Sequence, residues 1–165
     1  MWQTGLSRFE LQQLGVQLGA DVPVFIFGQN AFGQGIGEEL SALDMPHLSY
    51  LLAMPKVHIA TPLIFSSPNL CRNTPKINPE DWQNGFGHND LEPVACALFP
   101  AVLDYIKQLS KFGNAKMTGS GACVFVEFPD KKSAQEAQKT LPKSMQTWLV
   151  DGLKEHPLRS LANDF

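Results

Sequence analysis

Asp21 is an acidic residue in the stretch LGADVPVFIFG, residues 18–28. A Gly-Ala pair precedes it, and Val22-Pro23 and an apolar run follow. We predict an extended Val22 and a buried strand over residues 23–27, because a residue before proline is disfavoured in helices. A carboxylate at such a switch from helix to strand can take a proton from a hydroxyl or orient that hydroxyl for attack. The alternative is a turn aspartate that only caps local backbone N–H groups.

A second candidate for chemistry is the small-residue segment Gly119-Ser120-Gly121-Ala122. Glycines allow the backbone to approach a ligand closely, and successive N–H groups can cradle an anion. A tight β-turn that needs glycine at positive φ would explain the same residues. The P-loop pattern G-x-x-x-x-G-K-[ST] is absent from the sequence, so this segment is not a Walker loop.

Three weaker signals have ordinary structural explanations. Residues 33–37 read G-x-G-x-G, which differs from the dinucleotide-binding pattern and favours a hairpin turn. The acidic tetrapeptide at residues 89–92 stands where a helix begins, and helix capping accounts for it. The Phe65 ring could stack on a nucleotide base, but packing is the usual role of an aromatic residue.

The front of the chain must position Asp21. Ser7 and Glu10 have the spacing of a capping box, and leucines then recur at helical intervals, so we predict a helix over residues 8–18 with Gly19 as a left-handed stop. Strands are expected near residues 31–32 and 39–43. A buried strand over residues 50–54 and a short helix over residues 61–65 follow.

The rest of the chain must position the small-residue segment. Asn89 and Asp90 offer an N-cap for a strongly periodic helix, which Pro100 should kink or divide in two. Strands are expected over residues 115–118 and 123–128, a helix capped by Asp130 over residues 131–141, and a last strand over residues 147–150. From residue 50 onward this is the β-α-β-β-α-β order of a ferredoxin-like α+β fold.

The composition limits the classes of function. The chain has 165 residues, a net charge of −3 and scattered Lys and Arg, so we expect no nucleic-acid partner. No apolar run approaches the length of a membrane span, and no secretory signal is recognisable. The histidines and cysteines lack metal-ligand spacing, so no metal site is expected. Cys71, Cys96 and Cys123 form no C-x-x-C pair, which favours free thiols in a reducing cytoplasm.

Several motifs together resemble the GHMP kinase superfamily. They are LGADVPVFIFG, GIGEEL, ATPLIF, RNTPK, NDLEPVA and MTGSGACVFVEF, in this order. The resemblance extends from about residue 2 to residue 161. It implies transfer of the γ-phosphoryl group of ATP, with Mg²⁺, to the 2-hydroxyl of 4-diphosphocytidyl-2-C-methyl-D-erythritol in the non-mevalonate isoprenoid pathway.

The resemblance also implies roles for individual residues. Asp21 matches the catalytic aspartate, which would face a cleft between two domains. Thr61 and Phe65 match substrate-side positions, where the phenylalanine stacks on the cytosine ring. Gly119, Ser120, Gly121 and Ala122 match a glycine-rich motif that supports the nucleotide-binding loop. The roles of Arg72, Lys76 and Glu92 stay open.

The family resemblance implies two domains. Residues 1–46 would be a remnant of an N-terminal domain like ribosomal protein S5, and residues 47–165 the ferredoxin-like C-terminal domain of a GHMP kinase. The family's P-x-x-x-G-L-G-G-G-S-S phosphate loop and its N-terminal lysine do not occur in these 165 residues. We therefore expect the chain to lack useful kinase activity by itself, and to self-associate through exposed strand edges.

A different class of function fits the same fold order. A ferredoxin-like module could bind a small ligand or a partner protein without catalysis, because a fold alone does not determine a function. Protection of the chain by cytidine diphosphate would distinguish the kinase hypothesis from this alternative.

Overall fold

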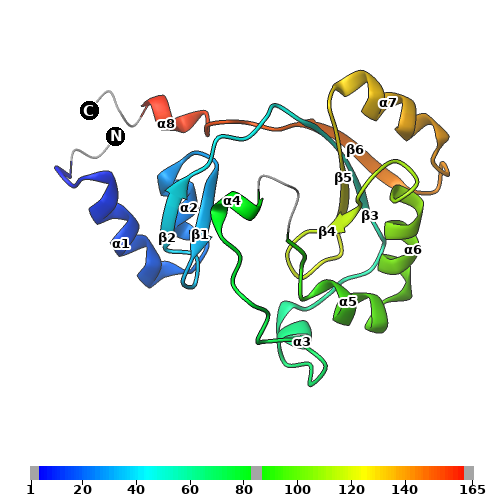
Figure 1. The fold of residues 1–165 in the computed structure, drawn as a ribbon, viewed down its shortest axis with the longest axis horizontal. Helices are drawn as coiled ribbons and strands as arrows, with labels where there is room; N and C mark the ends of the chain where they lie inside the picture. Colours follow the sequence, from blue (N-terminus) through cyan, green and yellow to red (C-terminus); the bar gives the residue numbers. More distant parts are fainter. Residues whose placement is uncertain (1–3, 83–86, 162–165) are drawn as a thin grey trace. The chain divides into compact units, whose positions relative to one another are not determined.

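The computed structural model describes residues 4–82 and 87–161. The chain divides into two compact units. Unit 1 consists of residues 1–47 and 153–165, and unit 2 of residues 48–152. Figure 1 labels the helices and strands of both units.

Unit 2 is built on a four-stranded antiparallel sheet (Figure 1). Its strands are β3 (Ser49–Met54), β4 (Lys116–Met117), β5 (Val124–Phe128) and β6 (Gln146–Asp151). Their order across the sheet is β4-β5-β3-β6, and β3 pairs with both β5 and β6. Helices connect β3 to β4 and β5 to β6, so the predicted ferredoxin-like α+β arrangement is confirmed.

The described helices of unit 2 are α3 (Thr61–Phe65), α4 (Pro79–Trp82), α5 (Glu92–Leu98), α6 (Pro100–Leu109) and α7 (Lys131–Thr140). The predicted break at Pro100 is confirmed, because this residue begins α6. The predicted helix start at Asn89 and Asp90 is wrong. Leu91 is the N-cap of α5, and the Glu92 N–H donates to the Asn89 carbonyl at 3.0 Å in the turn before the helix.

The hydrophobic core of the described residues lies in unit 2. Alternate residues of β3 and β5 face α6 and α7, and Leu51, Val124 and Val126 are fully buried. The buried apolar residues of this core all fall between residues 51 and 141. Each fully buried aliphatic side chain contributes about 1.5–3 kcal/mol relative to an exposed one, so this core dominates the stability of unit 2.

Unit 1 begins with α1 (Arg8–Leu18), whose bounds are those predicted. Its capping box is confirmed: the Glu10 N–H donates to Ser7 Oγ at 3.3 Å, and the Ser7 N–H donates to Glu10 Oε2 at 2.8 Å. The left-handed stop predicted at Gly19 is wrong, because its φ of 164° is extended. The chain turns there through a hydrogen bond from the Val22 N–H to the Gly19 carbonyl at 3.1 Å.

The strand predicted over residues 23–27 is wrong, since these residues belong to a helix, α2 (Val22–Phe27). A short apolar run is compatible with either element. Pro23 stands in the first turn, where its missing N–H costs no hydrogen bond, and Gly28 ends the helix at a φ of 70°. Val24 and Phe25 are 38% and 69% exposed, so the run does not enter an interior.

A hairpin and the C-terminal segment complete unit 1. β1 (Ala31–Gln34) and β2 (Glu39–Ala42) pair antiparallel, which confirms the hairpin turn predicted at residues 33–37. The segment that leads to α8 (Leu158–Leu161) contacts the residues just before β1. The His156 N–H donates to the Gly28 carbonyl at 2.8 Å. The assignment of residues 1–46 and 47–165 to two family domains stays a prediction.

None of the helices within residues 4–82 and 87–161 combines the length and apolarity that a bilayer span requires.

Candidate functional site

Asp21 is the N-cap of α2, at the joint between the two helices that open unit 1. The residue is exposed, and its side chain makes no cap hydrogen bond to the helix. The alternative role of Asp21, capping local N–H groups, therefore lacks the hydrogen bond that would define it. The carboxylate is accessible to a hydroxyl group of a ligand.

Two close approaches determine the backbone around Asp21. A Cβ added at Gly15 of α1 would lie 2.8 Å from Ile26 Cδ1, so α1 and α2 are in direct contact. Gly37, in the hairpin turn, has a φ of 117°, and a Cβ there would lie 3.1 Å from the Ala20 carbonyl oxygen. The residue before Asp21 is thus held by the hairpin, and packing rather than its own side chain positions Asp21.

Thr61 and Ser120 come together in unit 2. Thr61 Oγ1 and Ser120 Oγ lie 2.8 Å apart in a hydrogen bond between residues separated by 59 positions. Thr61 is the first residue of α3, and Ser120 lies between β4 and β5. The structure therefore brings a predicted substrate-binding residue into contact with the predicted glycine-rich segment.

The segment from Gly119 to Ala122 forms a tight turn. The Gly121 N–H donates to the Thr118 carbonyl at 3.1 Å, and φ is 56° at Gly119 and 94° at Gly121. A Cβ at Gly121 would lie 2.8 Å from Met117 Sδ, whereas a Cβ at Gly119 would meet no atom of the described residues within 4 Å. The positive φ values agree with the tight-turn explanation for both glycines, and the described residues leave open space beside Gly119.

Phe65 is the last residue of α3, one helical turn after Thr61, as its spacing predicted. Its side chain is 54% exposed, while the neighbouring Ile64 is fully buried and anchors the helix. The Arg72 guanidinium donates to the Phe65 carbonyl at 2.6 Å and to two further carbonyls of the loop that follows. Arg72 therefore stabilises the loop that directly follows Phe65.

Asn89 is a residue of this site that the sequence did not reveal. We predicted a helix cap, but its side-chain amide donates to the carbonyls of Met117 and Gly119, at 3.0 and 2.8 Å. No spacing rule connects Asn89 with a turn 30 residues later, so only the folded sheet shows the contact. Lys76 is exposed, and its role stays open.

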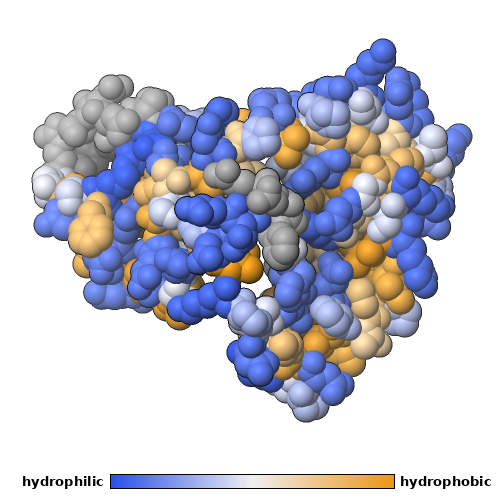
Figure 2. All heavy atoms as spheres, in the orientation of Figure 1, coloured by the Kyte–Doolittle hydropathy of each residue, from blue (hydrophilic) through white to orange (hydrophobic). Residues whose placement is uncertain are grey.

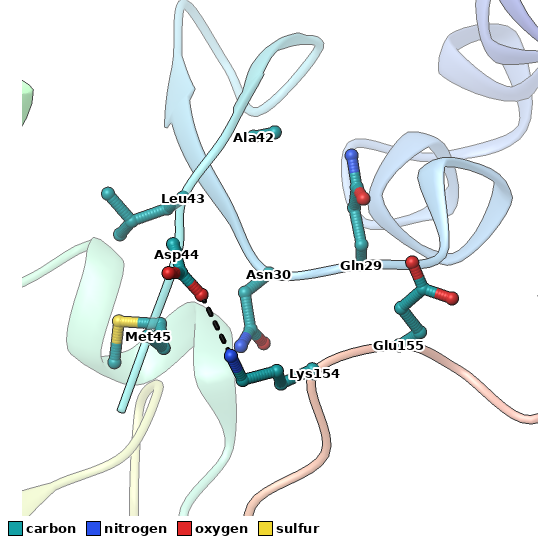
Figure 3. Close-up of a pocket in the computed structure, with 8 residues that line it drawn as sticks. All are labelled: Gln29, Asn30, Ala42, Leu43, Asp44, Met45, Lys154 and Glu155. Atoms are coloured by element: carbon teal, nitrogen blue, oxygen red, sulfur yellow. Dashed lines mark hydrogen bonds and ion pairs between the residues drawn. The ribbon is translucent and has the colours of Figure 1, made fainter. Parts of the chain in front are cut away.

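Two surface cavities in unit 1 involve none of the predicted site residues. The smaller, of about 200 Å³, is lined by polar and charged residues together with apolar ones from β2 and its continuation. Figure 3 shows Lys154 reaching toward Asp44, with Nζ and Oδ1 3.0 Å apart. Both groups are largely exposed, so this ion pair adds little stability. The larger cavity, of about 450 Å³, lies among residues of α1, α2 and α8.

The described residues also bear on a metal site and on the state of the cysteines. No three His, Cys, Asp or Glu side chains gather as a metal site within the described part of the chain. All three cysteines are free, as predicted. Burial raises the pKa of the Cys96 and Cys123 thiols, and at Cys96 the Glu92 carboxylate raises it further.

Comparisons with known proteins agree with the motifs. Residues 73–147 match the family model described as GHMP kinases C terminal. The chain is 49% identical over 163 residues to the 4-diphosphocytidyl-2-C-methyl-D-erythritol kinase of Dechloromonas aromatica, and 48% identical over 165 residues to that of Herminiimonas arsenicoxydans. A crystal structure of 4-(cytidine 5'-diphospho)-2C-methyl-D-erythritol kinase matches 86% of this chain and 56% of its own, with a TM-score of 0.69 and 27% identity.

The chain covers only part of these relatives. The two sequence matches include 98% of this chain but 60% and 58% of the relatives' lengths. The chain therefore spans about three-fifths of the curated proteins that it matches. Sequence and fold together confirm the resemblance to the GHMP kinases, and residues 73–147 match the C-terminal part of that family.

Proposed function

We propose that this chain acts in the ATP-dependent phosphorylation of the 2-hydroxyl of 4-diphosphocytidyl-2-C-methyl-D-erythritol, in the non-mevalonate isoprenoid pathway. The names of the relatives support the reaction. The observation that carries the proposal is the 2.8 Å contact between Thr61 and Ser120, because it joins two predicted site segments in one place.

The proposed roles follow from the chemistry of the side chains. Asp21 takes the proton of the attacking hydroxyl or orients its oxygen. Phosphoryl transfer depends mainly on positioning and charge stabilisation, so one fixed carboxylate suffices on the acceptor side. Phe65 offers an exposed ring for stacking on the cytosine, and the Thr61 hydroxyl offers a hydrogen bond beside it.

ATP and Mg²⁺ are the cofactors proposed for this reaction. In kinases the ion is held largely by phosphate oxygens, water and one or two carboxylates, and it neutralises charge on the transferring group. No group of three or more His, Cys, Asp or Glu side chains gathers among the described residues. The proposal therefore assigns no step of this chain's residues to Mg²⁺.

Titration with cytidine diphosphate tests the substrate class. We expect saturable binding to the folded chain, and a roughly tenfold loss of affinity in Phe65→Ala, because one base stacking on an aromatic ring is worth about 1–3 kcal/mol. Phe9→Ala is the matched control, since Phe9 is also exposed but lies in unit 1. A folded chain that does not bind cytidine diphosphate would favour the non-catalytic ferredoxin-like module.

Phosphoryl transfer from Mg-ATP to the named substrate tests the role of Asp21. We expect Asp21→Asn to lower any turnover at least a hundredfold, and Asp44→Asn to leave it unchanged. Asp44 is an exposed carboxylate of the same unit. Turnover that survives in Asp21→Asn would contradict the assignment of the catalytic carboxylate.

We propose two further properties of the chain. Its three unpaired cysteines favour the reducing cytoplasm. Exposed apolar side chains on α1 and α2 favour self-association, with Leu18 and Phe25 exposed by 82% and 69%.

A further inference from the structure

We propose that Asn89 and Glu92 are positioning residues that hold the turn from Gly119 to Ala122 in its ligand-binding shape. The inference rests on the proposed function, because the turn contacts Thr61 through Ser120, and Thr61 belongs to the proposed site for cytidine diphosphate. Neither side chain was assigned such a role by the motifs.

The Asn89 side chain binds backbone groups on both sides of the point where the turn begins. Nδ2 donates to the Met117 carbonyl at 3.0 Å and to the Gly119 carbonyl at 2.8 Å, while Oδ1 accepts from the Leu91 N–H at 3.0 Å. Two carbonyls require the NH₂ group and one N–H requires the oxygen, so these partners determine the amide orientation. An apolar side chain of similar size at position 89 would remove all three hydrogen bonds.

Glu92 binds the same strand from the first turn of α5. Its Oε2 accepts from the Met117 N–H at 2.7 Å. β4 is an edge strand of two residues, and an edge strand has backbone groups without a strand partner on one side. Asn89 and Glu92 together take the carbonyl and the N–H of Met117, so two nearby side chains fix the edge that leads into the turn.

Fixing the Gly119 carbonyl also orients the next peptide group. The carbonyl of Gly119 and the N–H of Ser120 belong to one peptide unit, which is trans, so the two groups point in opposite directions. With its carbonyl held by Asn89, the peptide turns the Ser120 N–H away from Asn89. The Ser120 hydroxyl meanwhile lies 2.8 Å from Thr61 Oγ1. Asn89 therefore orients the backbone at Ser120, and Thr61 binds the Ser120 hydroxyl.

Asn89→Leu tests this proposal, with Asn69→Leu as the matched control. Asn69 is an exposed asparagine of the same unit, and neither substitution changes the charge near a diphosphate. We expect Asn89→Leu to shift the amide NMR signals of residues 117–122 and to weaken cytidine diphosphate binding at least tenfold. Signals of β3 and β6 should stay where they are, which separates positioning from loss of the fold.

Glu92 supplies a second, independent pair of variants. Glu92→Gln keeps an acceptor oxygen for the Met117 N–H and should retain affinity within about threefold. Glu92→Ala removes the acceptor and should weaken binding as Asn89→Leu does. This pair decides the question if Asn89→Leu fails to fold.

The outcomes separate the two proposals. Unchanged turn signals in both Asn89→Leu and Glu92→Ala would overturn the positioning role, whether or not the ligand binds. Unchanged affinity in folded variants with shifted signals would also overturn it. A wild-type chain that does not bind cytidine diphosphate overturns the proposed function, and the turn signals still show whether Asn89 and Glu92 set the turn.

Discussion

The two units of this chain are built in different ways. In the part that the structure describes, unit 2 holds all the apolar residues of the buried core. Unit 1 buries only four described residues, Gln12, Gly15, Pro23 and Gly28, and none of them has a large apolar side chain. It exposes large ones instead, among them Leu14 at 49% and Leu18 at 82%.

The buried core and the proposed catalytic carboxylate therefore belong to different units. The proposed binding residues Thr61, Phe65 and Ser120 lie on a unit with its own core, whereas Asp21 lies on a unit held by helix caps and glycine contacts. Figure 2 shows apolar surface among the hydrophilic residues on the face in view. A unit without a substantial core opens locally at lower free energy, so we expect unit 1 to be the less stable of the two.

The largest difference between the units should appear on truncating a leucine in each. Leu51→Ala in β3 should lower the free energy of unfolding by about 2–5 kcal/mol, because the side chain is fully buried. Leu18→Ala in α1 should change it by less than about 0.5 kcal/mol, because that side chain is mostly exposed. Urea unfolding of both variants checks this, and equal losses would contradict the comparison.

A larger side chain at Gly15 tests whether the packing of α1 against α2 stabilises unit 1. Gly15→Val should destabilise the α1–α2 pair by about 1–3 kcal/mol, since the new side chain meets Ile26 and Val22. Gln13→Val is the control, because Gln13 is exposed on the same helix. Amide hydrogen exchange should accelerate in α1 and α2 and stay unchanged in β3. Faster exchange in β3 as well would show that the two units do not unfold separately.

Self-association should depend on unit 1. Leu18→Glu places a charge on the exposed apolar side of α1, and we expect it to weaken association roughly tenfold, about 1.4 kcal/mol. Sedimentation velocity over a concentration series measures this. Leu153→Glu is a control, because Leu153 is exposed outside both helices of the pair. A wild-type chain that stays monomeric at all concentrations would rule out the proposed self-association.

The smallest effect concerns the two helix caps, one in each unit. Hydrogen bonds from Ser7 lower the pKa of Glu10, and the Ser133 N–H lowers the pKa of Asp130. A carboxyl group whose pKa is lowered in the folded state stabilises it above the ordinary carboxyl pKa of about 4. That contribution is lost as the pH falls through the lowered value.

Circular dichroism during acid titration checks the caps. Helical signal should decline below about pH 4, and Asp130→Asn should flatten this decline, because asparagine does not titrate. Asp104→Asn is the control, since Asp104 lies inside α6 and caps no helix. An unchanged acid profile in Asp130→Asn would contradict a stabilising role for the ionised cap.

Local signals predicted the helices and strands well where the determining contacts are close in sequence. The α1 capping box and the Asp130 cap of α7 each involve residues three positions apart, and both are confirmed. The strand predicted over residues 23–27 was wrong, because a short apolar run fits a strand or a helix equally. Pro23 at its start and Gly28 at its end were the signals for a helix.

The site depended on contacts that spacing does not encode. Thr61 and Phe65 share a helical turn, which their spacing predicted, but the bond from Thr61 to Ser120 joins distant segments. The family resemblance named both segments. It did not reveal that Asn89 donates to the Gly119 carbonyl or that Arg72 donates to the Phe65 carbonyl, because those contacts form only when the chain folds.

The most direct test of the account is an NMR titration of the folded chain with cytidine diphosphate. The account predicts saturable shifts of the amide signals of α3 and of residues 117–122, and their loss in Phe65→Ala. No saturable shift, or shifts confined to the unit 1 residues around the cavity in Figure 3, would contradict the claim that unit 2 holds the proposed substrate site.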